Sequence, residues 1–214
     1  RMLFPKWANR LPLLLGAGAT LALVAVVAAF AYWISPSTTQ VGYAPEQPVP
    51  YSHKLHAGDL GLDCRYCHVG VERSAVAMVP ATQTCMNCHS QIKPESPRLL
   101  PVRESFATGQ PLPWIRIHHA PDFVYFDHSI HVNSGVGCET CHGRVDRMEV
   151  VHQAEPLNMA WCLDCHRAPE KYLRPVSEVT TMGYQPPGDQ IALGLELRKA
   201  RNIQPTTNCS GCHR

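Results

Sequence analysis

The pentapeptide Cys-x-x-Cys-His occurs five times in this chain of 214 residues, and these copies contain all 10 cysteines. Cysteines three positions apart share one face of a helical turn. Two sulfurs so placed, followed by an imidazole, form the attachment motif for a c-type haem, in which both sulfurs bond the porphyrin edge and the histidine reaches the iron. With 12 histidines in the chain, five of them would follow five cysteine pairs by chance less often than about once in a million sequences.

The motifs assign two sets of residues. The cysteines predicted to bind haem covalently are Cys64, Cys67, Cys85, Cys88, Cys138, Cys141, Cys162, Cys165, Cys209 and Cys212. The histidines predicted as proximal iron ligands are His68, His89, His142, His166 and His213. We therefore expect five covalent c-type haems as the cofactors.

Two other uses of paired cysteines fit less well. Zinc ribbons need two Cys-x-x-Cys pairs for each metal, so five pairs would leave one over. Disulfides within each pair would suit an exported protein but would leave the five following histidines unexplained.

Histidines outside the motifs are candidates for the second iron ligand, which separates an electron carrier from a haem enzyme with an open iron. His53-x-x-His56 and His128-x-x-His131 each lie shortly before a motif. Each pair can direct two imidazoles toward two different irons, so we expect all four to be distal ligands.

The fifth distal ligand is expected to be His118, in an apolar run just ahead of the second His-x-x-His pair. The neighbouring His119 is the competing candidate for this ligand. His152 is as well suited to a solvated or propionate-contacting role as to binding iron. A thioether ligand from Met159 would raise one haem potential, although methionine in such a place more often packs. Weaker thioether candidates are Met78, Met148 and Met182.

The stretch from Leu13 to Ile34 carries no charge and is long enough to cross a bilayer as a helix. Arg1, Lys6 and Arg10 precede it, and the next cation is Lys54. The positive-inside bias therefore predicts a cytoplasmic N-terminus, with the rest of the chain on the periplasmic or outer side. A cleaved signal peptide is the alternative, but the apolar stretch exceeds a typical signal-peptide core.

With 19 prolines and 14 glycines, the chain is expected to hold little regular secondary structure. We predict one N-terminal transmembrane helix plus a loop-rich, mostly short-helix cytochrome domain organised around five haems. The predicted segments are 1–34 (stub and anchor), 35–50 (Pro-rich linker), and 51–214 (haem domain), the last comprising two-haem modules at 51–90 and 114–167 and a single-haem segment at 168–214. Five prolines between Ile92 and Pro113 exclude a long helix there, and Asp189 could cap a helix running to about Arg201.

A formal net charge of +2, without a long run of either sign, gives no electrostatic case for nucleic-acid binding.

Three strings of residues carry a family resemblance: Trp114 through Pro121-Asp122-Phe123-Val124-Tyr125-Phe126-Asp127-His128 to Asp146, Met159 to Arg167, and Cys209 to His213. Together with the single anchor they resemble the pentahaem cytochrome subunit of alternative complex III over nearly the whole chain. The His-x-x-His arrangement is also similar to that of small class III multihaem cytochromes. In the family, His118 fits the distal-ligand position, whereas His119 and His152 are not part of the motif.

The resemblance implies an electron-transfer subunit, without a catalytic site of its own, in a membrane-bound quinol:acceptor oxidoreductase. It implies partners that include polytopic quinol-binding subunits, an iron-sulfur and molybdopterin-like subunit, a monohaem cytochrome and a soluble periplasmic acceptor. Two rivals are a self-sufficient, membrane-anchored quinol dehydrogenase and a multihaem reductase. The second rival often replaces a motif histidine with lysine, and no Cys-x-x-Cys-Lys occurs here.

We expect the intact mass of the native protein to exceed the polypeptide mass by five haem groups, because both thioethers of each motif survive denaturation. Electrospray mass spectrometry under denaturing conditions measures this, and haem staining after gel electrophoresis is the control for covalent attachment. A mass equal to that of the bare polypeptide would refute the haem assignment.

Overall fold

A computed structural model describes residues 5–33 and 40–213 of the chain. Its contacts divide the chain into an N-terminal unit, Arg1–Gln40, and a C-terminal unit, Val41–Arg214. Three parts of the sequence predictions lie outside the described residues: the flanking cation Arg1, the last anchor residue Ile34, and positions 35–39 of the linker.

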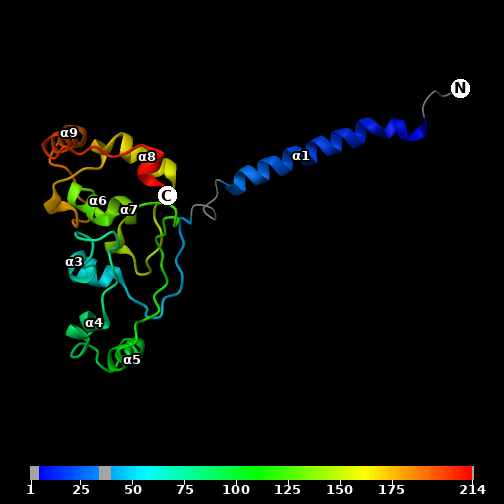
Figure 1. The fold of residues 1–214 in the computed structure, drawn as a ribbon. Helices are drawn as coiled ribbons and strands as arrows, with labels where there is room; N and C mark the ends of the chain where they lie inside the picture. Colours follow the sequence, from blue (N-terminus) through cyan, green and yellow to red (C-terminus); the bar gives the residue numbers. More distant parts are fainter. Residues whose placement is uncertain (1–4, 34–39, 214) are drawn as a thin grey trace. The chain divides into compact units, whose positions relative to one another are not determined.

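The N-terminal unit consists of a short 3-10 turn, η1 (Lys6–Arg10), that runs into helix α1 (Leu11–Trp33) (Figure 1). Leucine and alanine, which dominate α1, are strong helix formers. The most apolar 18-residue window of Trp7–Trp33 has a mean hydropathy of 2.4, and none of that window is buried inside the protein. A helix that is apolar on every side and uncovered by protein has the length and composition of a single-pass membrane anchor.

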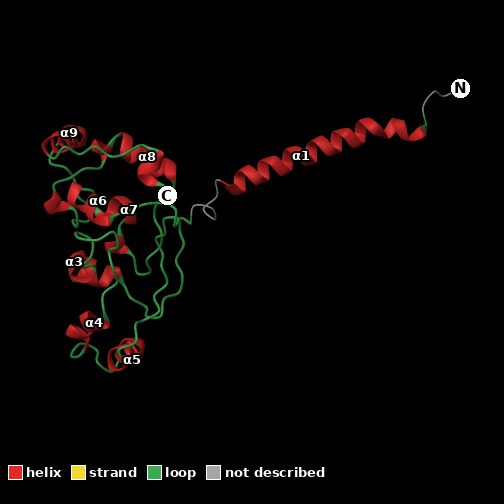
Figure 2. Cartoon of the chain, viewed as in Figure 1, coloured by secondary structure: helices red, strands yellow, loops and turns green. Residues whose placement is uncertain are grey.

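The C-terminal unit is built from short helical segments joined by loops (Figure 2). Its α-helices are α3 (Cys64–Cys67), α4 (Thr82–His89), α5 (Leu100–Thr108), α6 (His128–Ser134), α7 (Cys138–His142), α8 (Met159–Arg167), α9 (Gln190–Ala200) and α10 (Cys209–Cys212). Its other turns are the π-helix η2 (Lys54–Asp59) and the 3-10 turns η3 (Pro97–Leu99), η4 (Val145–Arg147), η5 (Pro169–Lys171) and η6 (Val176–Glu178). Extended pairing among the described residues is limited to two isolated bridges, Val124–His213 and Val136–Leu173. The predicted loop-rich, short-helix class is confirmed.

Side-chain caps define where several helices begin. Asp63, Asp127, Asn158 and Asp189 stand just before α3, α6, α8 and α9, and each accepts hydrogen bonds from backbone N–H groups of the first turn. Such caps satisfy donors that have no partner inside the helix. The predicted cap at Asp189 is confirmed, since its carboxylate accepts from the Ala192 N–H at 2.7 Å and α9 ends at Ala200.

The proline-rich connector contains one helix of nine residues, α5. Pro101 lies in its first turn, where the missing N–H would have no helical partner in any case. Gly109 ends the helix in the left-handed conformation, with φ at 72°. The prolines thus limit the helix without preventing it.

Apolar packing in the C-terminal unit is sparse. The buried cluster consists of Val71, Val132 and Val179. Leu173, six residues before Val179 in the chain, is also buried. Polar contacts supplement this packing around Glu139, whose carboxylate accepts from the Arg174 guanidinium at 2.9 Å and from the Gly183 N–H at 2.6 Å. The Arg174 and Glu139 side chains are only 10% and 15% exposed.

Two glycines allow backbone segments to approach one another closely. Gly135 ends α6 with φ at 92°, and a Cβ there would collide with the Arg174 carbonyl oxygen. Gly194 brings α9 against η5, where a Cβ would collide with the Glu170 carbonyl oxygen. Any side chain at either position would force these elements apart.

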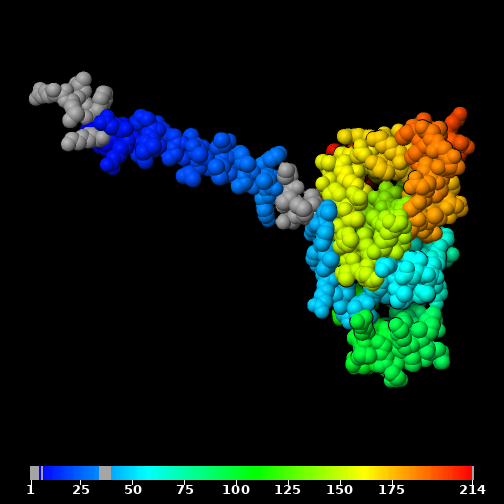
Figure 3. Space-filling model, turned by 180° about the vertical axis from the view of Figure 1, so that it is seen from behind, coloured from blue at the N-terminus to red at the C-terminus, as the bar shows by residue number. Residues whose placement is uncertain are grey.

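The start of the C-terminal unit lies alongside the segment that follows η4 (Figure 3). The Gly42 N–H donates to the Gln153 carbonyl at 2.8 Å, and the Gln153 N–H donates to the Tyr43 carbonyl at 3.0 Å. The Lys54 N–H likewise donates to the Met148 carbonyl at 3.0 Å. Backbone hydrogen bonds therefore hold the end of the predicted linker and the start of the first module against the second module.

We expect Glu139→Gln to lower the free energy of unfolding by about 3 kcal/mol, because it leaves the Arg174 guanidinium buried without a counter-ion. Thermal unfolding of the detergent-solubilised holoprotein, followed by circular dichroism, measures the change. The matched control is Glu149→Gln, which breaks the exposed Lys54–Glu149 pair and should change the midpoint little. Equal midpoints for all three proteins would show that the buried pair does not stabilise the fold.

Candidate haem-binding site

All five Cys-x-x-Cys-His motifs lie on helical turns. They occupy α3, the C-terminal half of α4, α7, α8 and α10. One turn of helix places both sulfurs of a motif on the same side, with the histidine next to the second sulfur. The local backbone therefore suits attachment of one haem edge at each motif.

In the first module, each motif histidine faces a histidine of the His53-x-x-His56 segment. The ring centres of His53 and His68 are 6.4 Å apart and their planes differ by 3°. The ring centres of His56 and His89 are 6.2 Å apart, with planes 64° apart.

The second module repeats this arrangement. The ring centres of His128 and His142 are 6.4 Å apart with planes 7° apart, and those of His131 and His166 are 6.1 Å apart with planes 39° apart. Two imidazoles bound to one metal from opposite sides, through bonds of about 2 Å, have ring centres about 6 Å apart. The donor set and its spacing therefore fit an iron held between two imidazoles in each of the four pairs.

The second nitrogen of most of these rings is held by the backbone. The His68, His89 and His56 Nδ1 atoms lie 2.7, 2.9 and 2.8 Å from the carbonyl oxygens of Met78, Ile92 and Ser52. Since a carbonyl only accepts, each Nδ1 carries the proton and leaves Nε2 free as a ligand atom.

Carbonyls distant in sequence perform the same task in the second module. The His128 Nδ1 donates to the Ala75 carbonyl at 2.9 Å, and the His166 Nδ1 donates to the Thr206 carbonyl at 2.7 Å. The His131 Nδ1 donates to the nearer Asp127 carbonyl at 2.7 Å. The first module and the C-terminal segment thus orient rings that belong to the second module.

Burial keeps several of these rings neutral. Burial, together with a smaller effect of neighbouring imidazoles, lowers the pKa of His53 to about 4 and that of His142 to about 3. Burial also lowers the pKa of His131. A neutral imidazole is the form that binds a metal.

His118 does not lie beside His213 in the structure. Its ring centre is 4.3 Å from that of His142, edge to face at 81°. Burial lowers the pKa of His118 to about 4. Among the described residues, the ring that lies against His213 belongs to Phe123, with centres 5.7 Å apart. Distal ligation by His118 stays a prediction.

The alternative distal ligands lie elsewhere. The His119 Nε2 is 3.9 Å from an Asp122 carboxylate oxygen, and the His152 Nδ1 is 3.4 Å from the Val150 carbonyl oxygen. Met159, at the start of α8, is 64% exposed. Within the part of the chain that the structure describes, none of these contacts brings an imidazole or thioether to His213.

Cysteines of different motifs are neighbours in a consistent order. The thiols of Cys64 and Cys138 lie within hydrogen-bonding distance of each other. Electrostatic interaction links three more pairs of thiols: Cys67 with Cys85, Cys141 with Cys165, and Cys162 with Cys212. The motifs therefore follow one another as second, first, third, fourth and fifth, and α4, α3, α7 and α8 show the same succession in Figure 1.

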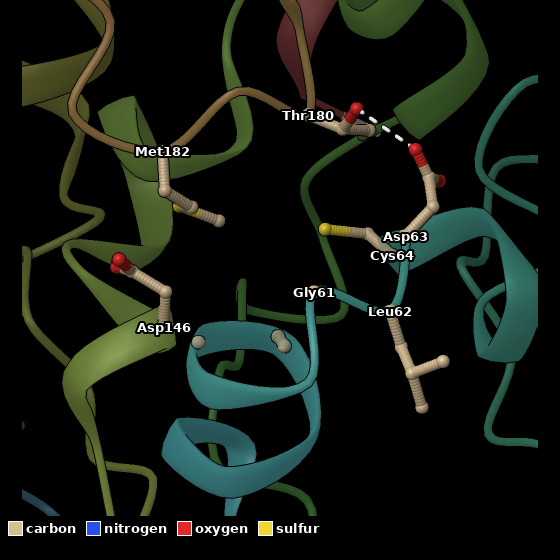
Figure 4. A pocket seen from close by; sticks show the side chains of 9 residues that line it. Gly61, Leu62, Asp63, Cys64, Asp146, Thr180 and Met182 are labelled. Atoms are coloured by element: carbon tan, nitrogen blue, oxygen red, sulfur yellow. Dashed lines mark hydrogen bonds between the residues drawn. The ribbon is translucent and has the colours of Figure 1, made fainter.

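A cavity of about 310 Å³ opens beside the first motif (Figure 4). Cys64, Asp63 and Thr180 border it on one side, and Asp146 and Met182 on the other. The Thr180 hydroxyl donates to the Asp63 carboxylate at 3.1 Å. The cavity adjoins the Cys64 sulfur and so belongs to the site of the first motif.

Asp63 also holds the first motif through Arg65. Its carboxylate accepts two hydrogen bonds from the Arg65 guanidinium, both at 2.8 Å, and one from the Arg65 backbone N–H. The guanidinium hydrogen bonds lower the pKa of Asp63 to about 2.

Sequence reasoning missed two aromatic residues, Tyr51 and Phe126, whose rings touch both histidines of the following His-x-x-His segment. The signal was present, because an aromatic residue stands two positions before the first histidine in both modules. It also missed the carbonyls that orient the rings, since no side chain marks them.

The chain is similar in sequence to known multihaem cytochromes c. Residues 124–214 match the family model of cytochrome c7 and related cytochrome c, and this segment contains the third, fourth and fifth motifs. The chain is also 35% identical over 120 residues to the multihaem cytochrome c subunit of menaquinone reductase from Nitratidesulfovibrio vulgaris. That alignment covers 55% of this chain and 54% of the relative, so the chain spans about half of the relative's length.

We expect Asp63→Asn to lower the free energy of unfolding near neutral pH and to have little effect in acid. The pKa of Asp63 is lower in the folded protein than the ordinary value of about 3.9, so its charge stabilises the fold above about pH 4 and this contribution is lost as the pH falls toward 2. Denaturant unfolding of the wild type and the variant should differ near pH 6 and converge near pH 2. A difference that is the same at both values would exclude the carboxylate charge as its source.

Proposed function

We propose that this chain is an electron-transfer subunit that carries five c-type haems and is anchored to a membrane by α1. The observation that carries the proposal is the set of four imidazole pairs, each with ring centres between 6.1 and 6.4 Å apart. Every pair joins a motif histidine to a His-x-x-His segment, as a bis-imidazole site requires. The match of residues 124–214 to cytochrome c7 and its relatives supports the same reading.

The proposal assigns each haem its covalent attachment and its iron ligands. We propose that the two cysteines of each motif bind one haem, with the following histidine as proximal ligand. The distal ligands are then assigned in pairs: His53 opposite His68, His56 opposite His89, His128 opposite His142, and His131 opposite His166.

A bound c-type haem supplies one-electron chemistry at its iron. The chain's contribution would be to hold two imidazoles in a fixed orientation at each of four iron sites. The Nδ1–H groups that donate to backbone carbonyls fix the ring orientation and raise ligand basicity. Coordination that does not change on reduction keeps the reorganisation cost of electron transfer low.

The order of the motifs supports a relay. Neighbouring cysteines connect the second, first, third, fourth and fifth motifs in a single succession. We propose that electrons pass along this succession, between the second motif at one end and the fifth at the other.

We propose that the relay belongs to a larger complex, which the anchor and the resemblance support. Lys6 and Arg10 precede the apolar part of α1, so we propose a cytoplasmic N-terminus and a C-terminal unit on the periplasmic side. We further propose the complex to be a quinol:acceptor oxidoreductase of the alternative complex III type. Its partners would be polytopic quinol-binding subunits, an iron-sulfur and molybdopterin-like subunit, a monohaem cytochrome and a soluble acceptor.

A second candidate reverses the direction of electron flow. The relative in Nitratidesulfovibrio vulgaris is named a subunit of menaquinone reductase, which implies electrons moving toward the quinone in that protein. The same four imidazole pairs would serve either direction, because the direction depends on the potentials of the partners.

The native complex distinguishes the two candidates. If the chain relays electrons from quinol, adding a quinol to the purified complex should reduce its haems, as followed in the visible spectrum. Reduction by a reduced soluble cytochrome, with quinol ineffective, would favour the reductase. Purification through an affinity tag on this chain identifies the co-purifying subunits in the same experiment.

We expect His131→Ala to open one iron site, so that carbon monoxide binds about one fifth of the reduced haem. The matched control is His119→Ala, because the His119 side chain is 44% exposed and pairs with Asp122. The control should bind no more carbon monoxide than the wild type. An unchanged spectrum in His131→Ala, with five haems still attached, would remove His131 from the ligand set.

A further inference from the structure

Tyr51 and Phe126 make the same two ring contacts in the two modules. The Tyr51 ring meets the His53 ring edge to face, with centres 4.8 Å apart and planes at 85°, and stacks on the His56 ring at 4.4 Å and 21°. The Phe126 ring meets the His128 ring at 4.8 Å and 85°, and stacks on the His131 ring at 4.9 Å and 25°. Two segments of different sequence therefore arrive at one arrangement.

Each aromatic ring touches imidazoles that face two different motifs. His53 and His56 face the first and second motifs, and His128 and His131 face the third and fourth. One side chain thus contacts ligands at two neighbouring sites. Such rings favour edge-to-face and offset-stacked contacts, which resist rotation of either partner.

The geometry of the aromatic contact correlates with the angle between the two imidazole planes of each pair. Histidines met edge to face, His53 and His128, are nearly parallel to their motif partners, at 3° and 7°. Histidines that are stacked, His56 and His131, are tilted by 64° and 39° from theirs. Both modules show this division into one parallel and one tilted pair.

We propose that Tyr51 and Phe126 are positioning residues, each of which sets the imidazole planes at two neighbouring iron sites. This inference rests on the proposed function, since it assumes an iron between the members of each pair. Groups that fix the orientation of a metal-bound imidazole also tune the metal. Each ring therefore gives its module two unlike iron sites, one with parallel and one with tilted ligands.

The ring, and not the tyrosine hydroxyl, carries the effect. Phe126 makes the same contacts without a hydroxyl. The Tyr51 hydroxyl lies near Cys67 and Cys85, and burial raises its pKa far above the ordinary value. A phenylalanine at position 51 should thus preserve the ligand planes.

Electron paramagnetic resonance of the oxidised protein tests the proposal, because the angle between two imidazole planes governs the anisotropy of a low-spin ferric signal. The wild type should show two signals of the parallel type and two of the tilted type, besides the signal of the fifth site. A single type for all four sites would overturn the proposal without any variant.

Variants in the intact protein localise the effect. Phe126→Leu removes the ring and should shift two of the five signals and the potentials of the same two haems, leaving the other three unchanged. Tyr51→Leu should shift the other two bis-imidazole signals. The ring-conserving controls Phe126→Tyr and Tyr51→Phe should retain the wild-type signals.

Two results would count against the positioning role: leucine variants with wild-type signals, or ring-conserving variants that shift the signals as far as the leucine variants do. The intact mass of each sample separates this failure from failure of the proposed function. Five haem additions with unshifted signals would reject only the positioning role, whereas missing additions would reject the haem sites themselves.

Discussion

The facing imidazole pairs are the interaction on which the arrangement of the C-terminal unit depends. Each pair joins a motif helix to a segment that lies earlier in the chain, at the separation that a shared metal requires. Apolar packing contributes little beside them, since the buried cluster consists of Val71, Val132 and Val179. A unit with many short helices and loops would otherwise gain too little from burial to offset the entropy of ordering its backbone. We therefore propose that iron coordination by these imidazoles both supports electron transfer and cross-links the segments of the unit.

Hydrogen bonds from the outer ring nitrogens extend this constraint across the modules. Ala75, in the first module, accepts from His128 in the second, and Thr206, near the end of the chain, accepts from His166. A shift in one module would turn a ring in another. The backbone bonds that hold residues 42–54 against residues 148–153 oppose such shifts, as does the buried Arg174–Glu139 pair. Rigid ligand planes are what a relay needs, because motion of the ligands during electron transfer would raise the reorganisation cost.

Contacts with one aromatic ring account for the two kinds of imidazole pair in each module. In each module one aromatic ring is stacked on one histidine and edge-on to the other, so a single side chain produces two angles. The fifth motif stands apart from this scheme, with Phe123 beside His213 and with Val124 and His213 joined in a backbone bridge. It also ends the succession of neighbouring cysteines.

The sequence by itself determined the apolar N-terminal helix and the short-helix class, and it predicted the cofactor attachment points, because each follows from local spacing. Cys-x-x-Cys-His needs one helical turn, a span needs a continuous apolar run, and Asp189 caps the helix that follows it. The sequence also selected the four histidines of the His-x-x-His segments as candidates. Only the tertiary structure decided which of them faces which motif, that His118 lies against His142, and that the motifs succeed one another out of chain order. These depend on loops that cross between modules and on carbonyl acceptors such as Ala75 and Thr206, whose position no residue type encodes, because every residue carries the same carbonyl.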